Sequence, residues 1–483
     1  MKDLNSNALI RKEPREPKAW EALISLLGII VIMAVGIVKF KADPHVPMFI
    51  GVMLAAIIAL RLGYKWAEVE KMMIAGITQA MQAVLILIIV GMMVGVWLLS
   101  GTIPTMIYYG MKLLKPSFFL ITAVIVCSIT SIATGTSWGT VGTMGLALMG
   151  IANGLGIPAA PAAGAIISGA YFGDKLSPLS ETTNLAPAVS GTDVFSHIKY
   201  MMKGTIVAYV ITLAFYGIYG AKLGISTSSV DTSHVEIIMN GINDNFYINP
   251  VLAIPPLIVI ITIILKVPAI PGITMGLISA AILAVIFQDA SFGEICVSAK
   301  DGFVCKTGVK SVDNLLTNGG LMNMSSSILM TIIAMMFGGI MEGTGQLEAL
   351  INRVTRFMKT GPALILGTEI TCIVSNITMP EQYISILVPG RMFAPVYREK
   401  GLHPKCLSNA LESAGTVSSG LIPWNTCGMY MGGILGISAA VYGKWAIFNW
   451  VMPIVTFIFA CVGWNVSYMT DEQKEEAEMG MIV

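Results

Sequence analysis

The sequence predicts an all-α polytopic membrane protein, built as two inverted repeats that each contain a re-entrant hairpin and a discontinuous helix. The first observation is composition, because 55% of the 483 residues are hydrophobic and 12% are charged, whereas about 25% of a soluble domain is charged. The second is a series of apolar stretches of about 20 residues, the length that crosses the hydrocarbon core as a helix. The third is that proline and glycine recur in the same order in both halves of the chain.

Eight apolar stretches are uninterrupted and predict plain membrane helices. They are 20–38, 46–63, 77–99, 198–222, 250–266, 270–288, 321–341 and 446–466. Four further regions are interrupted by Gly, Ser, Thr, Asn and Pro: 117–155, 158–190, 361–394 and 404–440. We expect 117–155 and 361–394 to be re-entrant hairpins and the other two to be broken helices. Irregular backbone survives at membrane depth only where protein or a water-filled cavity covers it.

The distribution of Lys and Arg predicts the orientation, since basic residues concentrate on the cytoplasmic side. Lys2, Arg11, Lys12, Arg15 and Lys18 lie in the first 19 residues, whereas 225–249 contains no Lys or Arg. We therefore expect a multi-pass protein of the cell (inner) membrane with both termini in the cytoplasm. The expected order is a cytoplasmic tail (1–19), a first transmembrane repeat (20–222), an external loop (223–249), a second transmembrane repeat (250–466) and a cytoplasmic tail (467–483).

The internal repeat rests on four matched positions in one order. They are Pro47 with Pro271, Gly101 with Gly343, Pro158 with Pro404, and Pro178 with Pro423. If the hairpins are re-entrant, each half crosses the membrane five times, and an odd number inverts the second half relative to the first. Inverted repeats with discontinuous helices are typical of secondary transporters.

The four interruptions are rich in side-chain oxygen. The two hairpin tips read TGTSWGT (134–140) and SNITMPEQ (375–382), and the two broken helices read YFGDKLSPLSETTN (171–184) and LESAGTVSSGLIPWNTCG (411–428). Glycine permits close approach of the backbone, and proline frees carbonyls that a helix would otherwise bond. Unwound carbonyls and half-helix ends are the groups that coordinate Na⁺ in such transporters. These segments therefore predict cation sites.

Several acids lie inside these apolar regions. A charged residue at the centre of a membrane helix costs about 2.5–3.5 kcal/mol on insertion scales, so Asp174, Glu381 and Glu412 predict function rather than packing. Glu181 follows Pro178 and fits an interfacial position equally well. Glu369 and Glu342 fit helix-surface or interfacial positions better.

Competition between Na⁺ and H⁺ for one such carboxylate is sufficient to couple the fluxes of the two ions. Burial favours the neutral form of a carboxylate, so that it holds either a proton or a sodium ion. Exposure to alternate sides then couples the two fluxes in opposite directions. The expected ion-binding and coupling residues, which would also be the Na⁺ ligands, are Asp174, Glu381, Glu412, Glu181, Asn376, Thr378, Ser375, Thr136, Ser137, Ser177, Thr182, Thr183, Asn184, Gln382, Asn425 and Thr426.

At these segments the chain resembles the NhaC-type sodium/proton antiporter family, within a superfamily of ion transporters with paired hairpins. The resemblance is carried by GTSWGTVGTMG, GAYFGDKLSPLSETTNLAP, EQYISILVPGRMF and LIPWNTCG, and it covers nearly the whole chain after the N-terminal tail. It implies exchange of cytoplasmic Na⁺, in some members Li⁺, for external H⁺. One departure concerns ion preference: relatives tend to carry an aspartate in a Gly-Asp-Gln run where this chain has Pro380-Glu381-Gln382.

An organic-anion exchanger and an enzyme fit the sequence less well than a cation/proton antiporter. Some relatives couple Na⁺ and H⁺ to malate–lactate exchange, but the candidate segments offer Lys175 as the one base among several acids, which favours a bare cation over an organic anion. An enzyme would need a nucleophile–base pair or metal ligands at depth, and the isolated histidines and the missing HExxH motif disfavour it. We therefore expect no enzymatic activity, no cofactor, no transition metal and no nucleic acid. The expected partners are Na⁺, H⁺ and the lipid bilayer, with a homodimer as an allowed assembly.

Overall fold

The computed structural model describes residues 14–227, 232–265, 267–355, 358, 360–464 and 466–470. Within these ranges every named element is a helix, and extended pairing is limited to two isolated bridges. Seven of the described helices are long and apolar enough to cross a membrane, or up to nine spans if two bent helix pairs are each counted as one. The predicted fold class, an all-α polytopic membrane protein, is confirmed. The basic residues Lys2, Arg11 and Lys12, and the C-terminal tail from 471 onward, lie outside the described residues.

The chain forms two compact units, and the first consists of Met1–Ala80 and Ile332–Phe357. Its elements are α1 (Ala19–Ala34), the π-helix η1 (Val35–Lys39), α2 (His45–Leu62), α3 (Trp66–Gln79), the second part of α17 (Ser325–Gly343) and α18 (Gln346–Thr355). Two glycines bring α3 and α17 into backbone contact. A Cβ atom on Gly76 would lie 2.1 Å from the carbonyl oxygen of Met335, and one on Gly339 would lie 2.1 Å from that of Met72. Small residues at such crossings are usual in membrane proteins.

The second unit consists of Met81–Thr331 and Met358–Val483. Its elements in the first half are α4 (Met81–Leu99), α5 (Thr102–Leu113), α6 (Pro116–Thr134), α7 (Ser137–Thr140), the π-helix η2 (Val141–Gly145), α8 (Leu146–Gly154), α9 (Ala159–Leu176), α10 (Glu181–Ser190), α11 (Val194–Thr227) and α12 (Thr232–Asn245). They continue with η3 (Pro250–Ala253), α13 (Ile254–Ile264), α14 (Ala269–Gln288), α15 (Phe292–Asp301), α16 (Lys310–Leu316) and η4 (Leu321–Met324). The last are α19 (Gly361–Thr378), α20 (Gln382–Glu399), α21 (Pro404–Ala410), the π-helix η5 (Leu411–Thr416), α22 (Val417–Ser419), α23 (Thr426–Leu435), α24 (Ala439–Tyr442), η6 (Gly443–Trp445) and α25 (Ile447–Cys461).

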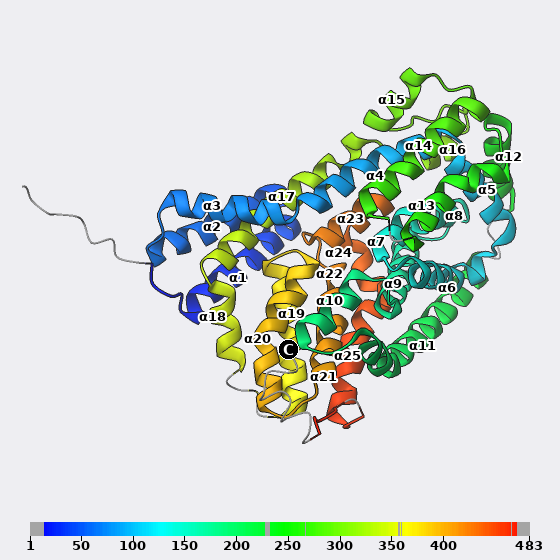
Figure 1. Ribbon diagram of the computed structural model, residues 1–483. Helices are drawn as coiled ribbons and strands as arrows, with labels where there is room; N and C mark the ends of the chain where they lie inside the picture. Colours follow the sequence, from blue (N-terminus) through cyan, green and yellow to red (C-terminus); the bar gives the residue numbers. More distant parts are fainter. Residues whose placement is uncertain are drawn as a thin grey trace, which may run out of the picture. The chain divides into compact units, whose positions relative to one another are not determined.

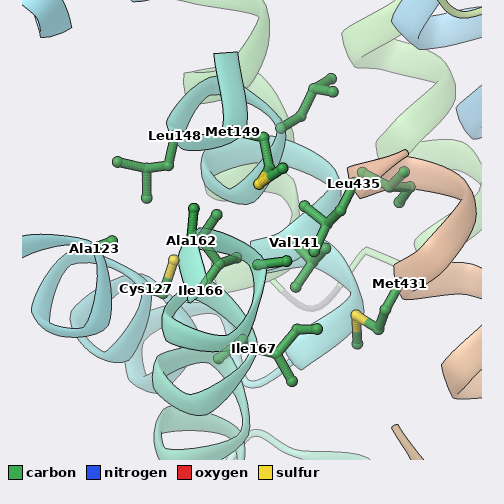
Figure 2. Packing of buried hydrophobic residues seen from close by; sticks show 14 of the residues in the cluster. Ala123, Cys127, Val141, Leu148, Met149, Ala162, Ile166, Ile167, Met431 and Leu435 are labelled. Atoms are coloured by element: carbon green, nitrogen blue, oxygen red, sulfur yellow. The ribbon is translucent and has the colours of Figure 1, made fainter. Parts of the chain in front are cut away.

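A buried apolar core joins α6, α8, α9 and α23 of the second unit. Figure 2 shows side chains from all four elements, and from η2, gathered in one packed region. The residues labelled there are Ala123, Cys127, Val141, Leu148, Met149, Ala162, Ile166, Ile167, Met431 and Leu435. This core fixes α9 against α6, and the polar end of α9 follows directly after it along the chain.

Each predicted interruption coincides with a break between helices. The breaks lie at 135–136, 177–180, 379–381 and 420–425. Gly135 ends α6 in the left-handed conformation, with φ of 72°, and a Cβ there would lie 2.6 Å from that of Leu179. Prolines that cannot donate to a helix lie in the other three breaks. The inverted relation of the halves and the re-entrance of the hairpins stay predictions.

Some predicted boundaries differ from the structure. The stretches 250–266 and 446–466 contain the shorter helices α13 and α25, each of which follows a bend, of 97° after Glu236–Asn245 and of 57° after Ala439–Trp445. The segment 223–249, expected as a loop, contains α12. Hydropathy alone does not reveal these bends, because it carries no information on the direction of the backbone.

Candidate ion-binding site

The centre of the candidate site is the end of α9. Asp174 lies in the last turn of this helix, and its side chain is 5% exposed. The break that follows exposes the last carbonyls of α9, and the hydroxyl of Thr183 donates to two of them, those of Asp174 at 3.1 Å and Lys175 at 3.2 Å. Ser180 caps the next helix by accepting from the amide of Thr183. The sequence SPLSETT therefore ends one helix and starts another with little gap.

The first hairpin tip contacts the same acid. Ser137 donates to Oδ2 of Asp174 through its hydroxyl at 2.6 Å and through its backbone amide at 3.1 Å. Thr136 caps α7 by accepting from the amide of Gly139 at 3.2 Å, which aims the start of α7 at Asp174. Two segments that are 37 residues apart thus meet at one carboxylate, as charge-assisted hydrogen bonds favour.

The second hairpin and its broken helix meet at Asn376. Its amide donates to the carbonyl of Gly415 at 2.7 Å and to the hydroxyl of Ser418 at 3.0 Å. Asn425, which caps α23, donates to Oδ1 of Asn376 at 3.0 Å. One asparagine therefore joins α19, η5 and α23. The carbonyl of Gly415 lies in the π-helical turn η5, and such turns are frequent at functional sites.

Glu381 has a structural task in the described conformation. Its Oε2 accepts from the amides of Tyr383 at 2.7 Å and Ile384 at 3.1 Å, so that it caps α20. The hydroxyl of Tyr383 donates to Glu181 of α10, and Figure 1 shows α10 beside α20. The tip of the second hairpin is thereby linked to the broken helix of the first half.

Glu412 lies on η5 and is fully buried. The hydroxyl of Thr182 donates to its Oε1 at 3.2 Å, and its Oε2 makes no hydrogen bond with the described residues. The hydroxyls of Ser375 and Thr426, which adjoin Asn376 and Asn425, are likewise buried without a partner. Unpaired buried oxygens are rare and need an explanation. A cation that accepts their lone pairs is one, and it fits the oxygen-only donor set.

Most predicted site residues are buried together in the second unit. Those that are less than 9% exposed are Asp174, Ser137, Ser177, Thr182, Thr183, Ser375, Asn376, Thr378, Glu381, Gln382, Glu412, Asn425 and Thr426. Thr136 is partly exposed, and Glu181 and Asn184 are exposed. Two of these side chains also hold backbone carbonyls near the breaks: the hydroxyl of Thr378 donates to Val374 at 2.8 Å, and that of Ser177 donates to Ile132 at 2.8 Å.

The prediction for Glu369 was wrong. It is 2% exposed on α19, whereas Glu342 is exposed as expected. Lys175 is also fully buried and donates to the hydroxyl of Ser413 at 3.1 Å. Lys175 could be recognised in the sequence as a charged residue within the Gly- and Ala-rich α9. The sequence alone does not show that the face of α19 that carries Glu369 is buried.

A tightly held metal would need a denser donor set. Among the described residues no three or more His, Cys, Asp or Glu are grouped so as to hold a metal ion. A transported ion here would be held by one or two carboxylates together with hydroxyl, amide and carbonyl oxygens. Such a mixed set suits an ion that must be released again.

The comparisons with known proteins decide the family. The profile of the Na⁺/H⁺ antiporter family matches residues 169–464, a range that begins just before Asp174 and includes both broken helices. The chain belongs to this family. It is similar to the Na(+)/H(+) antiporter NhaC of Alkalihalophilus pseudofirmus, with 34% identity over 443 residues, 91% of this chain and 95% of the relative. The predicted resemblance is confirmed, and the protein is a multi-pass membrane antiporter by family.

Members of similar identity carry other names. The Malate-2H(+)/Na(+)-lactate antiporter of Bacillus subtilis is 35% identical over 470 residues, 97% of this chain and 100% of the relative. The Arginine/ornithine antiporter ArcD of Halobacterium salinarum is 35% identical over 466 residues, 96% of each chain. Identity therefore does not separate a cation cargo from an organic one.

Proposed function

We propose that this chain exchanges cytoplasmic Na⁺, with Li⁺ as a second cargo, for external H⁺ across the cell membrane. The observation that carries the proposal is the buried carboxylate of Asp174 at the meeting point of the α9 break and the first hairpin tip. A proton and a sodium ion would compete for this carboxylate. Asn376, Glu412 and the unpaired hydroxyls of Ser375 and Thr426 would complete the cation's oxygen shell from the second half.

The local structure supports such competition in physical terms. The hydroxyl of Ser137 stabilises the anionic form of Asp174, while burial favours the protonated form. A carboxylate that exchanges a proton for a cation needs support for both forms, and these two effects are of that kind. The carbonyls at the C-terminal end of α9 add partial negative charge that favours a cation. Loss of one ion and gain of the other then requires only that the site open to alternate sides.

The second candidate is exchange of organic anions coupled to Na⁺ and H⁺, which the name of the Bacillus subtilis malate/lactate relative raises. An organic carboxylate would need a cation, and Lys175 is buried near the site. However, Lys175 lies within electrostatic reach of Glu412 and Glu369. Two acids therefore already share this buried base, which supports a bare cation over an organic anion.

The cargo test is decay of a preformed ΔpH in everted membrane vesicles. Addition of Na⁺ or Li⁺ alone should dequench a ΔpH-sensitive dye, and K⁺ should not. A response that requires malate together with lactate, or arginine together with ornithine, would overturn the cation proposal. Vesicles that contain the Asp174→Asn variant at equal protein level serve as the matched blank, and normal exchange by this variant would remove Asp174 from the site.

The orientation belongs to the same proposal. Cytoplasmic termini follow from the basic N-terminal tail, which includes Arg15 and Lys18, and from the absence of Lys and Arg in 225–249. Cysteine labelling of tail and loop positions from one side of intact cells tests it, and labelling of the tail from outside would contradict it. A homodimer stays an allowed assembly, which mass measurement in detergent would settle.

A further inference from the structure

The first turn of α10 contacts three parts of the candidate site through three successive residues. Thr183 donates to the last carbonyls of α9, and Thr182 donates to Oε1 of Glu412 at 3.2 Å. Glu181 accepts a hydrogen bond from the hydroxyl of Tyr383 at the start of α20. This one turn therefore ties together the end of α9, η5 and the helix that follows the second hairpin tip.

The contact between Glu181 and Tyr383 is the outermost of the three. Thr182 and Thr183 are at most 4% exposed, whereas Glu181 is exposed and Tyr383 is 39% exposed. The two threonine contacts therefore belong to the buried site, and the contact between Glu181 and Tyr383 faces the surroundings of the protein. We call Glu181 and Tyr383 the α10–α20 latch.

The exposed face of α10 has the character of a surface that lines water. Its exposed residues are Glu181, Asn184 and Ala188, which lie at helical spacing. The next helix, α11, instead exposes large apolar side chains such as Ile206 and Val210, as a surface toward lipid does. Acidic residues at membrane depth face either the protein interior or a water-filled cavity. The exposed face of α10 therefore indicates a water-filled approach to the α10–α20 latch.

The direction of the two helices indicates the side of this approach. They run parallel, because Glu181 meets Tyr383 and, further along both helices, a Cβ atom on Gly390 would lie 2.5 Å from Cγ1 of Val189. Basic residues follow α10 and lie at or beyond the end of α20. They are Lys199, Lys203, Arg398, Lys400 and Lys405. Since basic residues concentrate on the cytoplasmic side, both helices lead from the latch toward the cytoplasm.

We propose that Glu181 and Tyr383 form the cytoplasmic gate of the ion site, and that the hydrogen bond between them holds this gate closed. The inference rests on the proposed cation exchange. Because α10 has 10 residues, it spans about 15 Å, which is about half of the hydrocarbon core. The latch therefore lies near the middle of the membrane, where secondary transporters hold their cargo.

The same contact explains how the gate opens. A cation that arrives from the cytoplasm competes with the hydroxyl of Tyr383 for the carboxylate of Glu181. Loss of the hydrogen bond frees the first turn of α10 from α20, so that the path between these two helices toward Asp174 opens. Tyr383 is thus a positioning residue, which acts on the ion through the position of α10.

Tyr383→Phe removes the hydroxyl and keeps the ring, so that the closed state loses its latch. Apparent affinity rises with the fraction of molecules that can bind. We therefore expect the KM for Na⁺ at the cytoplasmic face to fall about two- to tenfold, the size of one partly exposed hydrogen bond. The KM at the external face should not change, and kcat should fall because the gate must close before transport.

Glu181→Ala removes the acceptor of the same hydrogen bond. Two residues that act through one bond have non-additive effects. Tyr383→Phe should therefore leave the cytoplasmic KM unchanged when it is introduced into the Glu181→Ala protein, whatever Glu181→Ala does alone. This comparison separates the latch from the charge of Glu181, which itself attracts cations.

The measurement is the initial rate of ²²Na⁺ uptake into acid-loaded membrane vesicles. Everted vesicles present the cytoplasmic face to the added Na⁺, and right-side-out vesicles present the external face. Tyr397→Phe is the matched control, since Tyr397 lies on the same helix and its buried hydroxyl is 3.0 Å from that of Thr368. This control should change neither KM. If Tyr383→Phe does not reach the membrane, Tyr383→Met, which also lacks the hydroxyl, takes its place.

Three results would overturn the inference. An equal change of KM at both faces would make the pair part of the ion site itself rather than a gate. A lower thermal midpoint with both KM values unchanged would make the contact a structural tie. An effect of Tyr383→Phe that persists in the Glu181→Ala protein would show that the hydroxyl acts elsewhere. Absence of Na⁺-dependent exchange by the unchanged protein would instead refute the proposed function.

Discussion

Replacement of Ser137 by alanine tests how the first hairpin tip acts on Asp174. The variant loses the 2.6 Å hydroxyl contact but keeps the backbone amide at 3.1 Å. Hydrogen bonds to charged groups contribute about 1.5–3 kcal/mol, and the retained amide favours the lower end. Since about 1.4 kcal/mol is a factor of ten, proton competition at Asp174 should strengthen about tenfold. The apparent KM for Na⁺ should rise by up to that factor at the acidic end of the working range.

The same reasoning fixes the pH dependence. Because fewer protons compete as pH rises, the KM of Ser137→Ala should converge on that of the unchanged protein at alkaline pH. The assay is initial rate of Na⁺-dependent dequenching in proteoliposomes over a series of pH values. Ser131→Ala is the control, since this buried hydroxyl donates at 2.7 Å to the carbonyl of Ala170 rather than to an acid. An unchanged KM, or an increase of the same size at every pH, would refute the reasoning.

Three further changes have defined outcomes. Asn376→Ala removes three hydrogen bonds: the two of 2.7 and 3.0 Å that its amide donates to η5 and α22, and the one of 3.0 Å that it accepts from Asn425. We therefore expect about 3 kcal/mol less stability and loss of exchange; a thermal shift with exchange retained would show that the junction is only structural. Gly76→Ala should lower the thermal midpoint, because its Cβ would lie 2.1 Å from a backbone oxygen, whereas Gly204→Ala, with 3.6 Å to the nearest atom, should not. Asp313 lies on α16, which is between α14 and α17 along the chain, and hydrogen bonds from the amide and hydroxyl of Thr307 hold its pKa below the usual value. The ionised carboxylate therefore stabilises the folded protein at pH values above the unfolded pKa of about 3.9. This stabilisation is lost as the pH falls through the lower pKa of the folded state. Asp313→Ala should hasten proteolysis of 302–318 at pH 7, and equal cleavage of both proteins there would contradict this.

The sequence predicted the helix breaks well because their causes are local. Proline lacks the donor that continues a helix, and Gly135 adopts a conformation that other residues resist. Four breaks therefore lie within the four oxygen-rich segments. The polar residues in these segments are mostly buried because, at membrane depth, their hydrogen bonds must be made within the protein.

The sequence could not predict which segments meet. The contacts of Ser137 with Asp174 and of Asn376 with Gly415 join residues 37 and 39 positions apart, and their geometry depends on packing of whole helices. The burial of Glu369 was missed for a related reason, since Thr368, Glu369 and Thr371 place polar groups around much of α19 and give no clear apolar face. The capping of α20 by Glu381 was also missed, because glutamate is not a preferred cap.

The central claim is that Na⁺ and H⁺ compete for the carboxylate of Asp174. Proton release on Na⁺ binding tests it most directly, with purified protein in weakly buffered detergent solution and no gradient. The account predicts that addition of NaCl acidifies a solution of the unchanged protein, that KCl does not, and that Asp174→Asn of equal thermal stability gives a smaller release or none. Release from Asp174→Asn equal to that of the unchanged protein would contradict the claim.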